Sequence, residues 1–253
     1  MVYTPFDFNE AIAHRKDYVE DGLREGSPVV GLSFPDGIIL LTVRRTQRKV
    51  FEIYDRLAYS AIGRQSDIED IRLGAIKVAH EEGYGRSPDD VTAHRLVGFA
   101  LSPTLKKLFG DQFNAPAVVR ALFAELGTRP QDDLFYVLNY DGDYSQTGER
   151  AVIAGTPEAE ERMLAALSAG APPATRDDAI RLALEAWGHG ALESRRLPAD
   201  EKEVDDEARA RQVEALIAQE LKAGALEVGL LDRTTPNEAK FRLLDPAELP
   251  TRG

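Results

Sequence analysis

Few residues in this chain of 253 amino acids combine side-chain types and spacing that could do chemistry. The segments Gly-Tyr-Gly at 83–85 and Gly-His-Gly at 188–190 are not phosphate loops, because no lysine follows them in a strand–loop–helix pattern. Asp141-Gly142-Asp143 lacks the downstream glutamate of a calcium loop and is typical of a hairpin turn. The histidines lie scattered, without the spacing of metal ligands: His14, His80, His94 and His189. We therefore expect no metal site and no cofactor.

The composition excludes several other classes of protein. The absence of cysteine excludes disulfides, thiol catalysis and thiolate metal sites, and it fits a cytoplasmic location. A net charge of -12 argues against a nucleic-acid-binding surface, which needs a basic face. The apolar runs are too short for a membrane helix, and the N-terminus lacks the pattern of a secretory signal. We expect one globular domain over residues 1–253.

The stretch from Ser27 to Gly63 alternates short apolar runs with turns, and the remaining chain is predicted to pack around it. Pro35-Asp36-Gly37 supplies turn chemistry between the first two apolar runs. We interpret the runs as one antiparallel meander of four strands, at 28–32, 38–43, 49–54 and 57–62.

Helices and strands then alternate in blocks. Asp7 and Glu10 form a variant of the capping box at the start of a helix over 7–22. Apolar periodicity predicts further helices at 66–82, 87–108, 157–168 and 175–192. Thr156 and Thr175 are suited to cap the last two of these helices. Further strands are predicted at 118–126, 134–140 and 151–155, as a second sheet, and at 225–231 and 239–244.

This order of elements predicts the fold class. Strands and helices do not alternate one by one, which argues against a doubly wound parallel sheet. Two antiparallel sheets between two helix layers, the four-layer α/β/β/α sandwich of the α+β class, account best for the order. The acidic segment 197–222 fits this plan less well, and we interpret it either as an insert with its own helix or as a mobile acidic loop.

Two segments carry a family resemblance. Residues 52–58, Glu-Ile-Tyr-Asp-Arg-Leu-Ala, and the later Gly83-Tyr84 through Asp90-Val91-Thr92 resemble α-subunits of the bacterial, actinobacterial-type 20S proteasome. The preceding series is similar too: a strand, an Asp-Gly turn, a strand ending in Arg-Arg and a Lys-Val-Phe-Glu-Ile strand. The likeness covers residues 5–170 well and the remainder loosely. It implies the same four-layer fold.

The resemblance also implies a function without catalysis of its own. Such a subunit forms a homo-heptameric outer ring on the rings of a separate threonine-protease β-subunit. It gates substrate entry and docks an ATPase or another activator, which supports ATP-dependent protein degradation. The helix over 7–22 would pack between ring neighbours, and the leader before it would form the gate: Met1, Val2, Tyr3, Thr4, Pro5 and Phe6. The Tyr-Asp-Arg gate motif of archaeal and eukaryotic relatives is missing from this leader.

The resemblance assigns an activator-docking pocket to Gly26, Lys49 and Gly63. The lysine would receive the C-terminal carboxylate of the activator, because a point cation suits a carboxylate. The two glycines would let the activator tail approach the backbone. No catalytic residue is implied.

Two alternatives remain open. In proteasome β-subunits the nucleophile is an N-terminal threonine whose free amine is the base. Ser27 falls at the position of that threonine, and Lys49 falls at the position of the lysine that assists it. The alternative is therefore an N-terminal nucleophile (Ntn) type hydrolase that processes itself after Gly26. Val43 at the position of the acid, and Pro28 after the serine, argue against this reading. The second alternative is a ring-forming homologue without a protease partner.

Overall fold

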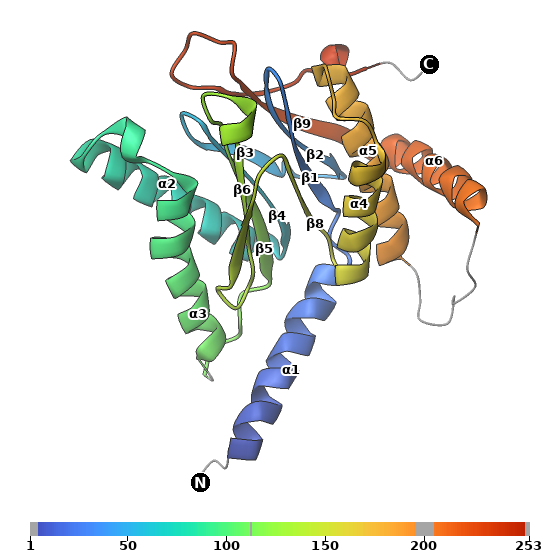
Figure 1. The fold of residues 1–253 in the computed structure, drawn as a ribbon. Coiled ribbons are helices and arrows are strands. Elements are labelled where there is room, and N and C mark those ends of the chain that lie inside the picture. The colour runs from blue at the N-terminus through green and yellow to red at the C-terminus, as the bar shows by residue number, and fades with distance from the viewer. Residues whose placement is uncertain (1–4, 112, 196–204, 251–253) are drawn as a thin grey trace.

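The computed structural model describes residues 5–111, 113–195 and 205–250. Within them, two five-stranded antiparallel sheets lie face to face between two groups of helices (Figure 1). The predicted four-layer α/β/β/α sandwich is therefore confirmed. No helix in these ranges is long and apolar enough to cross a membrane.

Each sheet combines strands from distant parts of the chain. The first sheet has the order β10 (Phe241–Leu243), β9 (Ala225–Asp232), β2 (Gly37–Arg44), β1 (Val29–Phe34), β8 (Arg150–Ile153). The second sheet has the order β3 (Val50–Tyr54), β4 (Leu57–Gly63), β5 (Val119–Glu125), β6 (Leu134–Leu138), β7 (Tyr144–Thr147).

The helices form the outer layers of the sandwich (Figure 1). The first sheet is covered by α4 (Pro157–Ala169), α5 (Arg176–Ser194) and α6 (Asp206–Ala223). The second is covered by α2 (Gln65–Gly85), the π-helical turn η2 (Arg95–Leu101) and α3 (Ser102–Gly110). Short 3₁₀ turns lie at η1 (Pro88–Asp90), η3 (Pro130–Asp132) and η4 (Pro246–Glu248). The first helix, α1 (Pro5–Arg24), projects from one end of the sandwich, with its C-terminal end against the sheets.

The central strand β2 explains why the sheets stack. Successive side chains of a strand point to opposite faces. Ile39, Leu41 and Val43 therefore join the core under α4, α5 and α6, and Ile38 and Leu40 join the core between the two sheets. Because both faces are buried, the strand is a continuous apolar run and not an alternating one.

The predicted four-stranded meander is wrong. Strands β1 and β2 pair with each other in the first sheet, and β3 and β4 pair with each other in the second. The chain crosses between the sheets after Arg44, because β9 from the far end of the chain takes the free edge of β2. That pairing is complete, from Gly37 opposite Asp232 to Arg44 opposite Ala225. The predicted second sheet is wrong for a similar reason, because β8 pairs with β1 and not with β5 or β6.

Several predicted boundaries also move. Helix α1 begins at Pro5, so Pro5 and Phe6 of the predicted gate are helical, whereas Met1–Thr4 lie outside the described residues. The helix predicted over 87–108 is divided into η1, η2 and α3. Pro103, which has no N–H to donate, lies in the first turn of α3, directly after the π-helical turn.

The C-terminal half matches its prediction more closely. Thr156 and Thr175 cap α4 and α5, each accepting a hydrogen bond from a backbone N–H three residues later. In the segment 197–222, α6 is a helix that buries Val213, Leu216 and Ile217, whereas residues 196–204 lie outside the described ranges. The polar strand β7, exposed throughout, was missed because it carries no apolar pattern.

Candidate functional site

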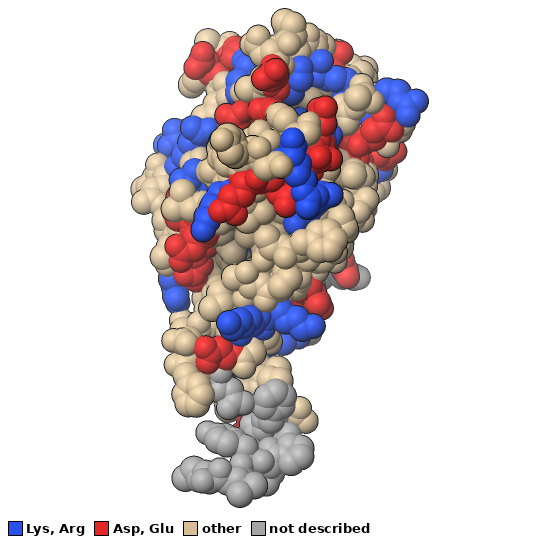
Figure 2. Space-filling model, turned by 90° about the vertical axis from the view of Figure 1, so that its left-hand side faces the viewer, with Lys and Arg blue, Asp and Glu red and all other residues tan. Residues whose placement is uncertain are grey.

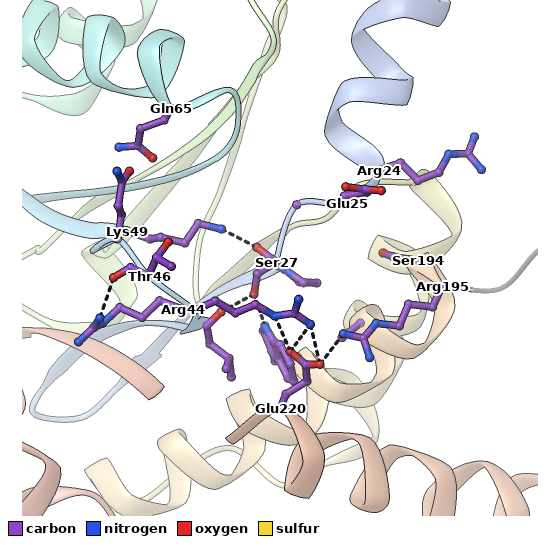
Figure 3. A pocket seen from close by; sticks show the side chains of 17 residues that line it. Arg24, Glu25, Ser27, Arg44, Thr46, Lys49, Gln65, Ser194, Arg195 and Glu220 are labelled. Atoms are coloured by element: carbon purple, nitrogen blue, oxygen red, sulfur yellow. Dashed lines mark hydrogen bonds and ion pairs between the residues drawn. The ribbon is translucent and has the colours of Figure 1, made fainter. Parts of the chain in front are cut away.

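A cavity of about 650 Å³ opens where the C-terminal end of α1 meets the end of β2 and the last turns of α5 and α6 (Figure 3). Its wall is strongly cationic. The lining residues include one lysine and four arginines: Arg24, Arg44, Arg45, Lys49 and Arg195. Among the lining residues that the structure describes, two carry a carboxylate, Glu25 and Glu220. The cavity is therefore suited to an anionic group.

Lys49 lies just before β3, and its backbone is fixed by a buried carboxylate. Glu227 on β9 accepts hydrogen bonds through Oε1 from the N–H groups of Lys49 and Val50, at 2.9 and 2.7 Å. The Lys49 side chain donates from Nζ to the carbonyl oxygen of Ser27, at 3.2 Å. Burial lowers the pKa of Lys49 from 10.5 to about 8, against the raising effect of the Glu227 charge. The ammonium is therefore mostly charged at neutral pH.

The other cations of the wall have carboxylate partners. Arg44 lies 3.0 Å from Oε2 of Glu227, and both Arg45 and Arg195 bind the carboxylate of Glu220. Arg24 has a longer contact of 3.9 Å with Asp21 on its own helix. Among the residues that the structure describes, no carboxylate lies within 4.0 Å of the Lys49 ammonium. Lys49 is thus, within the described ranges, the cation of this wall that has no carboxylate partner within 4.0 Å.

Ser27 is held in a structural network. Its hydroxyl donates to the carbonyl oxygen of Val43 at 2.7 Å and accepts a hydrogen bond from Nε1 of Trp187 at 3.2 Å. To act as an N-terminal nucleophile, Ser27 would first need the peptide bond to Gly26 to be cleaved, which would free its amine as the base. The Lys49 ammonium reaches the Ser27 carbonyl oxygen and not the hydroxyl. The structure therefore brings the two residues together without forming a catalytic pair.

The two predicted glycines differ in position. Gly26 lines the cavity, and a side chain there would lie 2.9 Å from Cβ of Ile62. Gly63 is not among the lining residues. It has a φ of +129°, and a Cβ there would lie 2.0 Å from the carbonyl oxygen of Val118. Close packing of the chain accounts for both glycines, and only Gly26 is placed to contact a ligand in the cavity.

Sequence reasoning missed the part of the wall that comes from the C-terminal half. Trp187, Ser194 and Glu220 line the cavity, and Glu227 lies behind Lys49. A glutamate within the apolar run of β9 was a signal for a buried partner, because such a charge needs hydrogen bonds to be tolerated. Glu220 offered no comparable signal, because it lies among many charged residues of a helix.

Comparisons with known proteins bear on the whole chain. No family model matches it. The "Proteasome subunit alpha" of Nocardioides sp. is 32% identical over 237 residues, which cover 93% of this chain and 82% of that protein. The proteins of the same name from Streptomyces coelicolor and Kineococcus radiotolerans are each 30% identical. They cover 97% and 96% of this chain, and the matches span 88% and 95% of their own lengths.

The sandwich fold is that of an N-terminal nucleophile hydrolase, and at the position of the nucleophile the Ser27 hydroxyl is held by Val43 and Trp187. The relatives show which family within this class the chain belongs to. The chain belongs to the proteasome α-subunit family and is a non-catalytic ring subunit. Membership implies a ring that assembles with proteasome β-subunits.

Proposed function

We propose that this subunit docks an activator through the cationic cavity, with Lys49 receiving the C-terminal carboxylate of the activator tail. The support is the Lys49 ammonium, which lines the cavity and, among the described residues, contacts a carbonyl oxygen but no carboxylate. A half-buried ammonium attracts a carboxylate more strongly than an exposed one, because less water screens the pair. A cavity of about 650 Å³ is within the common range for ligand sites of about 300–1,000 Å³.

Two further groups suit the cavity to a peptide tail. Ser194 has a buried hydroxyl without a hydrogen-bond partner among the described residues, so it can donate to a carboxylate or a carbonyl. Gly26 leaves the backbone open at the cavity edge, as the docking proposal requires. Gly63 has an indirect role in this proposal, because it ends β4 directly after Ile62, the residue against which Gly26 packs.

We infer that α1 mediates contacts within a homo-heptameric ring and carries the gate. Its Ile12 and Tyr18 side chains are 37% and 46% exposed, although both are apolar enough to favour a partner surface. Of the predicted gate residues, Met1–Thr4 lie outside the described ranges, and Pro5 and Phe6 are the first residues of α1. Deleting residues 2–6 is expected to raise the peptidase activity of the complex with β-subunits. An unchanged rate for a substrate that must pass the pore would refute the gate.

The helical face over the second sheet is our candidate for the contact with the β-subunit. Figure 2 shows this side of the molecule, where charges of both signs crowd the upper part and a largely uncharged area lies below them. Large apolar side chains stand exposed on α2, η2 and α3 and on the loop after α3: Leu73, Tyr84, Phe99, Leu108 and Phe113. Co-expression with a β-subunit tests the assembly, and recovery of α-rings alone would favour the homologue without a protease partner.

The cytoplasmic location stays a prediction from the cysteine-free composition.

Docking can be tested with peptides of unspecified sequence. The immobilised α-subunit is incubated with a library of acetylated pentapeptides that end in a free carboxylate, and with the same library as C-terminal amides. Mass spectrometry then identifies the retained peptides. We expect retention of free carboxylates only, with loss in Lys49→Ala and no loss in the control Lys77→Ala on the exposed face of α2. Equal retention by Lys49→Ala and the unaltered protein would refute the docking role.

A further inference from the structure

The cavity contains a second cationic group, built on Glu220 of α6. Arg45 donates from Nη2 to both carboxylate oxygens of Glu220, at 3.0 and 3.2 Å, and Arg195 donates from Nη2 to Oε1 at 2.7 Å. Two guanidinium groups share one carboxylate, so the group keeps a net charge of about +1. All three residues line the same cavity as Lys49. Figure 3 shows the Arg195 side chain directed toward the Glu220 carboxylate.

The geometry leaves the arginines open to a further anion. The Glu220 side chain is only 7% exposed, whereas the side chains of Arg45 and Arg195 are 64% and 45% exposed. Within the described ranges, neither guanidinium has an ion pair with any carboxylate other than that of Glu220. A guanidinium has five N–H donors, and Arg195 uses Nη2 in its bond to Glu220. Arg45 uses Nε and Nη2 in its bonds to Glu220. Among the described residues, the Nη1 donors of both groups therefore remain free while the shared carboxylate keeps the groups in place.

We propose that Arg45 and Arg195 form a second anion-binding point, so that the docked tail carries an acidic side chain in addition to its terminal carboxylate. This inference rests on the docking function proposed for Lys49. Guanidinium groups bind carboxylates through paired hydrogen bonds, which an ammonium cannot form. The lysine therefore anchors the chain terminus, and the arginine pair selects the side chain. Glu220 is a positioning residue that holds the two guanidinium groups at the cavity wall.

The same peptide library tests this selection. Peptides retained by the unaltered subunit are expected to be enriched in Asp or Glu at one position before the C-terminal residue. Arg45→Gln and Arg195→Gln, made singly so that Glu220 always keeps one partner, are expected to lose the enrichment while still retaining free carboxylates. Arg181→Gln, which replaces a similarly exposed arginine on α5, serves as the control.

A pair of single peptides gives the magnitude. From the most enriched sequence, one peptide with Glu and one with Gln at the selected position are titrated, with the fluorescence of Trp187, the only tryptophan of the chain, as the signal. We expect the Glu peptide to bind about 10-fold more tightly, and this ratio to fall to about 1 in Arg45→Gln with little change for the Gln peptide.

The outcomes separate the two proposals. Retention that depends on Lys49 but shows no acidic enrichment overturns the arginine site and leaves docking intact. Acidic enrichment that survives both arginine substitutions also overturns it. If the free-carboxylate library is not retained at all, the docking function fails and the arginine site fails with it.

Discussion

Replacing Lys49 with methionine is expected to stabilise the subunit while removing docking. Burial lowers the pKa of Lys49 from 10.5 to about 8, so the folded protein bears a cost for keeping this group charged. At about 1.4 kcal/mol per pKa unit, that cost is about 3 kcal/mol at neutral pH. Methionine removes it but also removes the hydrogen bond to the Ser27 carbonyl oxygen, worth about 1 kcal/mol. The net gain expected for Lys49→Met is therefore about 2 kcal/mol.

The gain depends on pH in a direction set by linkage. Between pH 8 and 10.5 the unfolded chain holds the Lys49 proton and the folded chain has lost it, so the stability of the unaltered subunit rises with pH in this range. The methionine variant has no such group. Its advantage should thus be full below pH 8 and disappear as the pH approaches 10.5.

Urea unfolding of both proteins at equal concentration, at pH 7 and at pH 10, measures this difference. Equal concentrations matter because ring assembly contributes to apparent stability. Groups that titrate in both proteins cancel when the two are compared at each pH. A variant that is less stable at pH 7, or an advantage that is the same at both values, would show that Lys49 is not held at an energetic cost.

Three further substitutions test the packing around the cavity. Glu227→Gln should lower the free energy of unfolding, measured in urea, by about 1–2 kcal/mol, because the buried carboxylate loses its charge beside the part-exposed Arg44. The control Glu238→Gln, at an exposed position, should leave this free energy unchanged. Gly63→Ala should cost at least about 2 kcal/mol, because its positive φ and the nearby Val118 carbonyl oxygen exclude a side chain. In contrast, Gly74→Ala in α2 should stabilise the subunit by about 0.5–1 kcal/mol, because the nearest atom to the added Cβ would be 3.6 Å away. A Gly63→Ala variant that unfolds at a higher temperature than Gly74→Ala would refute this reading. Ser27→Ala should leave the peptidase activity of the complex with β-subunits intact. It should lower the free energy of unfolding by about 1–2 kcal/mol, because the buried Trp187 N–H loses its acceptor. Loss of activity in a folded complex would instead indicate that Ser27 is catalytic.

Local signals along the chain predicted the type of most elements. Apolar periodicity located α2, α4 and α5 within a few residues, and Thr156 and Thr175 marked two helix starts, because these signals act between neighbours along the chain. The ordered series of short motifs also indicated the family. Lys49 was selected through that resemblance, and its docking role stays a proposal.

The distribution of the strands between the two sheets, and the residues that complete the cavity, depend on tertiary packing. A strand pattern specifies which residues are buried but not which partner covers them, so the distant β9 could replace β3 beside β2. In the same way, Trp187 and Glu220 reach Ser27 and Arg45 across 160 and 175 residues of sequence. Such contacts depend on the packing of whole layers, and local patterns in the chain carry no record of them.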